Sequence, residues 1–259
     1  MTIRVAVCGA LGKMGQEVVK TVLADPELTL VGLADSHAGK DDQNKSIQPI
    51  HADIKTMLAE TKPEVCVDFT HPDCVLKNTL AIIAADCRPV IGTTGLAEAD
   101  LQEIAAALTK QNIGGIVAPN FAIGAVLLMK FAQEASKYLD HAEIIEFHHN
   151  QKADAPSGTA IKTAELMAKS QTKFGKTNSA EKETYKGARG ATGPADVHIH
   201  SVRLPGLVAH QEVIFGAQGQ MLTIRHDSID RSSFMPGVAM ACKKVMELHG
   251  LTYGLEHLL

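Results

Sequence analysis

The sequence lacks tryptophan, and aromatic residues make up only 4% of its 259 residues. This scarcity disfavours a nucleic-acid-binding surface that stacks bases on aromatic side chains. No apolar run approaches the roughly 18 residues of a membrane-spanning helix, and the first residues show no signal-peptide pattern. Net charge is −4 and the isoelectric point is near 6.3. We therefore expect neither a nucleic-acid nor a membrane partner.

Cysteine is also sparse, and its spacing excludes the usual paired motifs. The five cysteines form no C-x-x-C pair. An odd number of scattered cysteines is typical of reduced thiols, so we expect a cytoplasmic location. Cys8 and Cys66 lie inside apolar, strand-like runs, where a small buried side chain is the ordinary interpretation.

What the sequence does contain is an alternation of strand-like and helical patterns over its first 120 residues. With 45% apolar and 21% charged residues, the composition is that of a soluble globular protein. Helical patterns cover about 14–23, 54–60, 74–85 and 97–108, with a polar loop over His37–Gln48. The predicted strands are Ile3–Cys8, Leu28–Ala34, Val65–Phe69, Pro89–Ile91 and Ile113–Ala118. This βαβα order predicts a parallel, doubly wound sheet.

The pattern changes after Phe121. A long helix is predicted over Ile123–Tyr138, a strand over Glu143–His148 and a helix from Ser157, its N-cap, to about Lys169. A polar loop over 170–196 follows. Three closely spaced strands are predicted at Val197–Leu204, Ala209–Phe215 and Gln220–His226, before a final helix at Phe234–Leu248. Strands without intervening helices predict a mixed or antiparallel sheet.

A glycine-rich turn joins the first strand to the first helix. It reads Gly9-Ala10-Leu11-Gly12-Lys13-Met14-Gly15, a G-x-x-G-x-x-G pattern whose small residues would let the backbone approach a pyrophosphate. Asp35 ends the second strand 20 residues after Gly15, where a carboxylate can accept hydrogen bonds from a ribose diol. A tight turn with a solvated aspartate is the alternative. The context favours dinucleotide binding.

The fold class predicted from these patterns is α/β. It consists of a Rossmann-like parallel-sheet domain and an inserted α+β domain with a mixed or antiparallel sheet. We assign dinucleotide binding to residues 1–121 and 232–259. Residues 122–231 are expected to form a substrate-binding and oligomerisation domain. The final helix is expected to return to the first sheet.

The sequence predicts the cofactor site more clearly than it predicts the choice between NADH and NADPH. Asp35 would repel a 2′-phosphate, and Ser36 and His37 follow it without an arginine. Lys13 and Lys40 could offset that repulsion, so we expect good use of NADH, with NADPH also possible. The loops Gly92–Gly95 and Ala118–Phe121 each follow a predicted parallel strand and should face the nicotinamide end.

The densest concentration of reactive side chains lies between Glu146 and Ala160. A strand delivers His148 and His149 and is followed by Lys152. The helix start at Ser157-Gly158-Thr159 then offers backbone N–H groups and hydroxyls suited to a carboxylate. Surface histidines with a solvated lysine are the plainer alternative. Neighbouring strand residues point to opposite faces, so His148 and His149 are a poor metal pair.

A zinc site is the rival interpretation of the twelve histidines. His198 and His200 have the H-x-H spacing that would let both side chains bind one ion. No surrounding array of carboxylates and histidines resembles a hydrolase site, so no metal is expected.

The run HHNQKADAPSGTA at 148–160 resembles the E-x-H-H-x-x-K-x-D-A-P-S-G-T-A element of the dihydrodipicolinate reductase family. The likeness extends to GALGKMG at 9–15, DFTHP at 68–72, GTTG at 92–95, APNF at 118–121, HSVRLPG at 200–206 and HDSIDRSSF at 226–234. Because these elements occur in order along almost the whole chain, the similarity is specific.

This resemblance implies a nicotinamide-dependent reduction of a cyclic dicarboxylate in lysine and diaminopimelate biosynthesis, carried out by a homotetramer. It implies that His148 is a proton donor and acceptor and that Lys152 is a proton donor. Substrate contacts are implied for His149, Ser157, Gly158, Thr159 and Arg231. Cofactor contacts are implied for Gly9, Ala10, Leu11, Gly12, Lys13, Met14, Asp35, Gly92, Thr93, Thr94, Ala118, Pro119, Asn120 and Phe121.

The residue types suit that chemistry without the resemblance. A dianionic substrate needs donors, and hydride addition to a conjugated imine builds charge that a histidine can neutralise by protonation. The predicted fold is also compatible with two other classes of protein. A non-enzymatic NAD-binding redox sensor would need a DNA-binding element, and no basic recognition helix is evident. A sugar or amino-acid dehydrogenase could share the two-domain plan.

Overall fold

The computed structural model describes residues 2–39, 48–175 and 182–259. It divides into two compact units, one formed by Met1–Phe121 with Phe234–Leu259 and the other by Ala122–Ser233. The expected boundaries at 121/122 and 231/232 lie at or within two residues of these limits. Most of the predicted loop over His37–Gln48 lies outside the described residues. None of the described helices is long and apolar enough to cross a membrane.

The first unit is built on a seven-stranded sheet in the order β12-β6-β5-β4-β1-β2-β3, and every neighbouring pair is parallel. Its strands are β1 (Ile3–Cys8), β2 (Leu28–Ala34), β3 (Ile50–His51), β4 (Val65–Asp68), β5 (Arg88–Ile91), β6 (Gly114–Val117) and β12 (Gly250–Tyr253). The predicted Rossmann-like parallel sheet is therefore confirmed.

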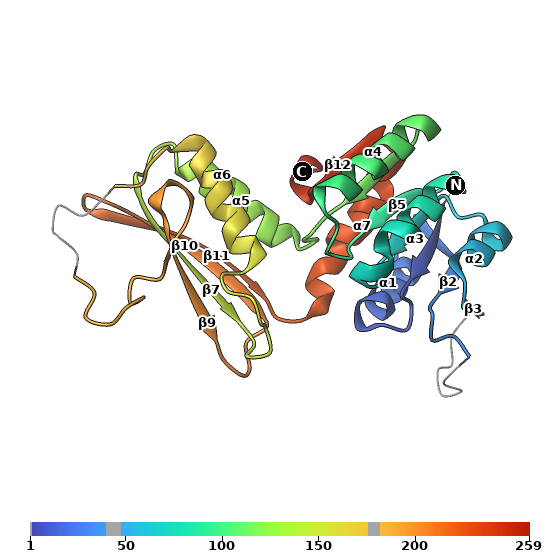
Figure 1. Ribbon diagram of the computed structural model, residues 1–259, viewed down its shortest axis with the longest axis horizontal. Coiled ribbons are helices and arrows are strands. Elements are labelled where there is room, and N and C mark those ends of the chain that lie inside the picture. Colours follow the sequence, from blue (N-terminus) through green and yellow to red (C-terminus); the bar gives the residue numbers. More distant parts are fainter. Residues whose placement is uncertain (1, 40–47, 176–181) are drawn as a thin grey trace. The chain divides into compact units, whose positions relative to one another are not determined.

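Helices cover this sheet in two layers (Figure 1). They are α1 (Lys13–Ala24), α2 (Ile54–Thr61), α3 (Pro72–Ala84), α4 (Glu98–Gln111) and α7 (Met235–Lys244). Ala6 and Cys8 of β1 pack in one buried cluster with Met57 of α2 and Val75 of α3. Alternate residues of β1 point to the other face, and α1 and α7 contact each other and β1. Cys8 and Cys66 are buried, as expected.

The second unit contains a five-stranded mixed sheet in the order β11-β10-β7-β9-β8. Its strands are β7 (His141–His148), β8 (Ala191–Thr192), β9 (His198–Arg203), β10 (Ala209–Ala217) and β11 (Gln220–Ser228). Only the β7–β9 pair is parallel. The helices α5 (Ile123–Ala135) and α6 (Gly158–Ser170) pack together. Helix α5 contacts β11, and helix α6 contacts β7. Ile144, Val213 and Phe215 form the buried apolar layer of this unit's sheet.

Some predicted elements are wrong in extent. Helix α5 stops at Ala135, after which the Lys137 and Tyr138 N–H groups donate to carbonyls three residues earlier, at 3.1 and 3.0 Å, so the predicted extension to Tyr138 does not form. Helix α7 ends at Lys244 and tightens into a 3-10 turn over Val245–Glu247. The predicted loop over 170–196 contains β8 and the short 3-10 turn Pro194–Asp196.

Candidate functional site

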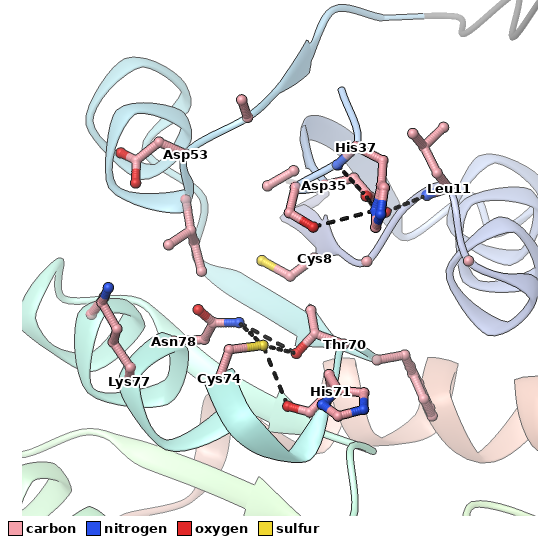
Figure 2. Close-up of a pocket in the computed structure, with 18 of the residues that line it drawn as sticks. Cys8, Leu11, Asp35, His37, Asp53, Thr70, His71, Cys74, Lys77 and Asn78 are labelled. Atoms are coloured by element: carbon pink, nitrogen blue, oxygen red, sulfur yellow. Dashed lines mark hydrogen bonds and ion pairs between the residues drawn. The ribbon is translucent and has the colours of Figure 1, made fainter. Parts of the chain in front are cut away.

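A cavity of about 630 Å³ opens beside the carboxyl ends of β1, β2 and β4 (Figure 2). The chain passes from β1 to β2 and β3 on one side and then crosses to β4 on the other. Such a reversal of strand order creates a crevice in which α/β sheets bind ligands. The volume falls within the usual range for small-molecule sites. The cavity is lined by Cys8, Gly9, Leu11 and Gly12, by Ala34–His37, by Ala52–Lys55, by Phe69–His71, and by Cys74, Lys77, Asn78 and Ala81.

In the glycine turn beside this cavity, backbone atoms pack directly against other backbone atoms. Gly9 has a φ of +77°, and a Cβ there would lie 2.4 Å from the Phe69 carbonyl oxygen. A Cβ at Gly15 would lie 2.0 Å from the Gly9 carbonyl oxygen. Gly12 caps α1 without a side chain, and the first turn of α1 contains no acidic residue. The turn therefore leaves a compact, uncapped helix N-terminus that fits a pyrophosphate.

Asp35 is held in place at the end of β2. Its Oδ2 accepts the Leu11 N–H at 3.0 Å, which ties the carboxylate to the glycine turn. Its Oδ1 accepts the His37 N–H at 2.9 Å. A carboxylate oxygen can accept more than one hydrogen bond, so Asp35 can also receive a ribose hydroxyl. The structure thus brings together four of the predicted cofactor residues as cavity lining, namely Gly9, Leu11, Gly12 and Asp35.

The other predicted cofactor loops lie at the ends of neighbouring strands. Gly92–Thr94 follows β5 and Ala118–Phe121 follows β6. A Cβ at Gly92 would lie 2.1 Å from the Phe69 ring, which also contacts Phe121 at a centroid distance of 5.8 Å. These loops are packed to one another through Phe69 and are not among the residues that line the cavity of Figure 2. Ala10, Lys13 and Met14 are likewise outside that lining.

Asp68 is a buried residue that the sequence-based site prediction missed. Its Oδ1 accepts hydrogen bonds from the hydroxyls of Thr70 at 2.7 Å and Thr93 at 2.6 Å, and its Oδ2 accepts from the Asn78 amide at 3.0 Å. The carboxylate therefore fastens the loop after β4 to the loop after β5. Its position at the end of the strand next to β1 was the available signal.

In the second unit, β7 ends at His148, and the residue two positions earlier, Glu146, is fully buried. Glu146 Oε2 lies 2.5 Å from His148 Nδ1. Arg203 of β9 donates from Nη1 to Oε2 and from Nη2 to Oε1, each at 2.8 Å. The Ser157 N–H donates to Oε1 at 3.1 Å. A single carboxylate thus joins two strands and the start of α6.

Burial would raise the pKa of Glu146, but hydrogen bonds from His148, Arg203 and Ser201 outweigh it and lower that pKa to about 2. The carboxylate is therefore ionised throughout the neutral range, and an ionised carboxylate only accepts hydrogen bonds. It follows that His148 carries a proton on Nδ1.

Lys152 and α6 complete this polar segment. Lys152 Nζ donates to both Asp154 carboxylate oxygens, at 2.7 and 2.8 Å, and its side chain is about one-fifth exposed. Ser157 is the N-cap, as predicted, because its hydroxyl accepts the Ala160 N–H at 3.2 Å. The first turn of α6 contains no acidic residue, and nothing lies within 4 Å of a Cβ built on Gly158. Open space beside a helix N-terminus suits an anion.

The remaining predicted substrate residues are less closely tied to this cluster. Thr159 is in the first turn of α6, and its carbonyl accepts the Thr163 hydroxyl at 2.8 Å. His149 lies in the exposed turn after β7, where its carbonyl accepts the Lys152 N–H at 3.2 Å. Arg231 starts the 3-10 turn Arg231–Phe234 and is exposed.

One member of the rival metal pair, His200, has another partner. His200 Nε2 lies 2.7 Å from Glu143 Oε2, and Arg189 donates to the other oxygen of the same carboxylate. Among the residues that the structure describes, no group of three or more histidine, cysteine, aspartate or glutamate side chains is arranged to hold a metal ion.

Three kinds of similarity agree with this geometry. A family model described as the N-terminus of dihydrodipicolinate reductase matches residues 3–121, and one for its C-terminus matches residues 124–259. A Synechococcus elongatus protein named 4-hydroxy-tetrahydrodipicolinate reductase is 51% identical over 271 residues, covering 99% of this chain and 98% of the relative. A Listeria monocytogenes protein of the same name is 51% identical over 263 residues, covering 99% of each.

Among solved structures, the dipicolinate-bound dihydrodipicolinate reductase from Paenisporosarcina sp. TG-14 is 46% identical. It superposes with a TM-score of 0.88 over 100% of both chains. Sheet order, glycine turn and cavity define a Rossmann-type protein of the dinucleotide-dependent oxidoreductase class, whose fold implies a nicotinamide cofactor. Within that class, the chain belongs to the dihydrodipicolinate reductase family.

Proposed function

We propose that the protein uses NAD(P)H to reduce 4-hydroxy-2,3,4,5-tetrahydrodipicolinate, by way of dihydrodipicolinate, to tetrahydrodipicolinate with loss of water. The reaction belongs to lysine and diaminopimelate biosynthesis. The arrangement of His148, Lys152 and the start of α6 around buried Glu146 carries this proposal. Family membership and the relatives named 4-hydroxy-tetrahydrodipicolinate reductase support it.

The first unit holds the nucleotide in this proposal. The N-terminus of α1 and the turn at Gly9–Met14 receive the pyrophosphate, and Asp35 accepts the ribose hydroxyls. Gly92–Thr94 and Ala118–Phe121 lie at the carboxyl ends of β5 and β6 and complete the nucleotide site. When bound, the nicotinamide supplies the hydride for the reduction.

The second unit holds the substrate and handles protons. One substrate carboxylate is received by the start of α6, through Ser157, Gly158 and Thr159. His149 and Arg231 provide further contacts. The substrate's negative charge competes with Asp154 for Lys152, which then donates a proton. His148 exchanges a proton through Nε2, because Glu146 occupies Nδ1.

A coupled assay tests the activity. The preceding synthase generates the unstable substrate from pyruvate and aspartate semialdehyde, and NADH absorbance is followed. We expect NADH oxidation only when the synthase and both of its substrates are present. Oxidation without the synthase, or none in the complete mixture, would contradict the proposal. A sensor would bind NADH without turnover, and a dehydrogenase for another substrate would leave this mixture unchanged.

The same assay measures cofactor preference. Asp35 favours NADH because a 2′-phosphate would be repelled by its carboxylate, and Lys13 reduces that repulsion. We expect kcat/KM values for NADH and NADPH of comparable size. A strong preference for NADPH would show that Asp35 does not control selection.

We also propose a cytoplasmic homotetramer assembled through the second unit. The face of its sheet opposite Ile144 and Val213 carries Ile145, Phe147 and Ile214, which are half-buried, and Met221, which is 77% exposed. Light scattering should give about four times the 27.6 kDa chain mass. Ile214→Glu should lower that mass while NADH binding is retained. A monomeric wild-type protein would refute the assembly.

A further inference from the structure

Glu146 combines complete burial with saturation by hydrogen-bond donors. The side chain has 0% exposure, and each carboxylate oxygen accepts at least two hydrogen bonds. Oε1 accepts from Arg203 and the Ser157 N–H, and Oε2 accepts from Arg203 and His148 Nδ1. With the further hydrogen bond from Ser201, no acceptor site is left for a substrate or for a transferred proton. Any contribution of Glu146 to the reaction must therefore pass through its partners.

Those partners are the groups that the proposed reaction uses. His148 is the proposed proton exchanger, and Ser157 begins the helix that receives the carboxylate. Arg203 also donates from Nη2 to the Asp154 carbonyl at 2.8 Å, which fixes the loop that carries Lys152. One ion pair consequently sets the positions of a strand end, a loop and a helix start. The three segments follow one another in the sequence, but the arginine that fixes them lies 57 residues from Glu146.

The contact with His148 has a chemical as well as a positional consequence. An acceptor at Nδ1 keeps the proton on that nitrogen, so in the neutral ring Nε2 is the basic nitrogen. When the ring is protonated, Nε2–H becomes the donor and the adjacent carboxylate stabilises the positive charge. This is the form that a proton donor for the reduced substrate requires.

We propose that Glu146, fixed by Arg203, is a positioning residue that selects the Nδ1–H tautomer of His148 and aligns the carboxylate-binding helix start with it. This inference rests on the proposed function for the role of His148 in turnover. The alternative is that the ion pair only stabilises the fold.

Substitution Glu146→Gln separates these possibilities because it keeps the shape but removes the charge. The chain also provides a matched control. Glu143 lies on the same strand and contacts a histidine, His200, and an arginine, Arg189, just as Glu146 contacts His148 and Arg203. Glu143 and Glu146 are three positions apart on the strand, so their carboxylates lie on opposite faces of the sheet. Glu143→Gln thus makes the same chemical change away from the proposed site.

In the coupled assay we expect Glu146→Gln to lower kcat by on the order of 10²-fold, within the range that proton-transfer groups contribute. The KM for NADH should stay at the wild-type value, because that site is in the other unit. Glu143→Gln should retain wild-type kcat. Thermal unfolding and light scattering on each variant establish that folded assemblies are compared. Equal kcat in folded Glu146→Gln and Glu143→Gln would overturn the proposal.

A second measurement requires neither turnover nor a folded Glu146→Gln variant. Carbon-13 labelling of histidine lets the Cδ2 chemical shift report the tautomer of each neutral ring, with the His148 signal assigned by its loss in His148→Gln. We expect wild-type His148 to be in the Nδ1–H form. An Nε2–H ring would overturn the proposal even if Glu146→Gln failed to fold. If the wild-type protein gave no reduction in the assay, the proposed function would fail while this measurement still tested the tautomer.

Discussion

His148 and Lys152 are the two side chains to which the proposed chemistry assigns proton transfer. We expect His148→Gln and Lys152→Ala each to lower kcat by about 10²–10⁴-fold, the usual contribution of a general acid or base. Because both lie in the second unit, the dissociation constant for NADH should stay near wild type. The chain has no tryptophan, so NADH fluorescence can measure binding without that background. Wild-type turnover in either variant would remove that residue from the mechanism.

The lowered pKa of Glu146 also predicts an acid response. Its folded-state pKa of about 2 lies below the ordinary 4.5, so its ionised form stabilises the fold above pH 4.5. That contribution is lost as pH falls from 4.5 towards 2. Because each pKa unit corresponds to about 1.4 kcal/mol, this contribution to the free energy of unfolding amounts to about 3 kcal/mol.

Urea unfolding of wild type and Glu146→Gln across this pH window checks the prediction. The free energy of unfolding of the wild type should fall more steeply with acidification than that of the variant, because only the wild type must protonate Glu146. Parallel curves for the two proteins would contradict it.

At this scale the sequence predicted roles for His148 and Lys152, and the Ser157 cap that the structure confirms, but not what holds them. Glu146 was visible in the same motif, yet its burial and its hydrogen-bond donors were not. Its main partner, Arg203, is 57 residues away in the chain and reaches it through the parallel pairing of β7 with β9. Such long-range pairing leaves no local pattern.

At the level of elements, the turn between β1 and α1 has the tightest steric requirement. A Cβ at Gly15 would lie 2.0 Å from the Gly9 carbonyl oxygen, and backbone cannot move aside as a side chain can. We expect Gly15→Ala to displace the start of α1, to weaken NADH binding and to cost about 1–3 kcal/mol in unfolding free energy.

Thermal unfolding and NADH titration measure both effects. Gly216→Ala in β10 is the control, because nothing lies within 4 Å of a Cβ there. It should keep wild-type NADH binding. If Gly15→Ala bound NADH as tightly as the control did, the close approach of α1 to the turn would not matter for binding.

The sequence predicted long elements better than short ones. Strands β1 and β2 have their predicted limits because continuous apolar runs mark strands buried on both faces. The two-residue strands β3 and β8 escaped notice, since so few residues carry no periodicity. Strand β12 was missed because the four residues Gly250–Tyr253 follow a helix directly, and their pairing with β6 is a long-range contact.

At the scale of the whole molecule, the first unit is assembled from two separate stretches of chain. The returning stretch supplies α7 and β12, with buried side chains that include Val238, Ala241, Cys242 and Leu255. We therefore expect residues 1–121 alone to show no cooperative thermal unfolding, because they leave one sheet edge and the surface under α7 exposed.

Joining the two stretches should restore the unit. A Cβ at Gly237 would lie 2.0 Å from the Phe121 carbonyl oxygen, so a short glycine-serine linker can connect 121 to 234. We expect this fusion to unfold cooperatively and to bind NADH. Circular dichroism and NADH fluorescence on both fragments test this. A cooperative, NADH-binding 1–121 fragment would show the returning stretch to be dispensable.

The pairing of β12 with β6 has a consequence for the order in which the protein folds during synthesis. Strand β6 is complete at Val117, but its partner at Gly250–Tyr253 is made only after the whole second unit. During that interval the ribosome-bound chain presents an unpaired parallel strand edge, a surface prone to wrong pairing. The inserted unit, whose strands are all contiguous within Ala122–Ser233, can finish folding first. The first unit, although it begins the chain, is thus the unit that is completed last.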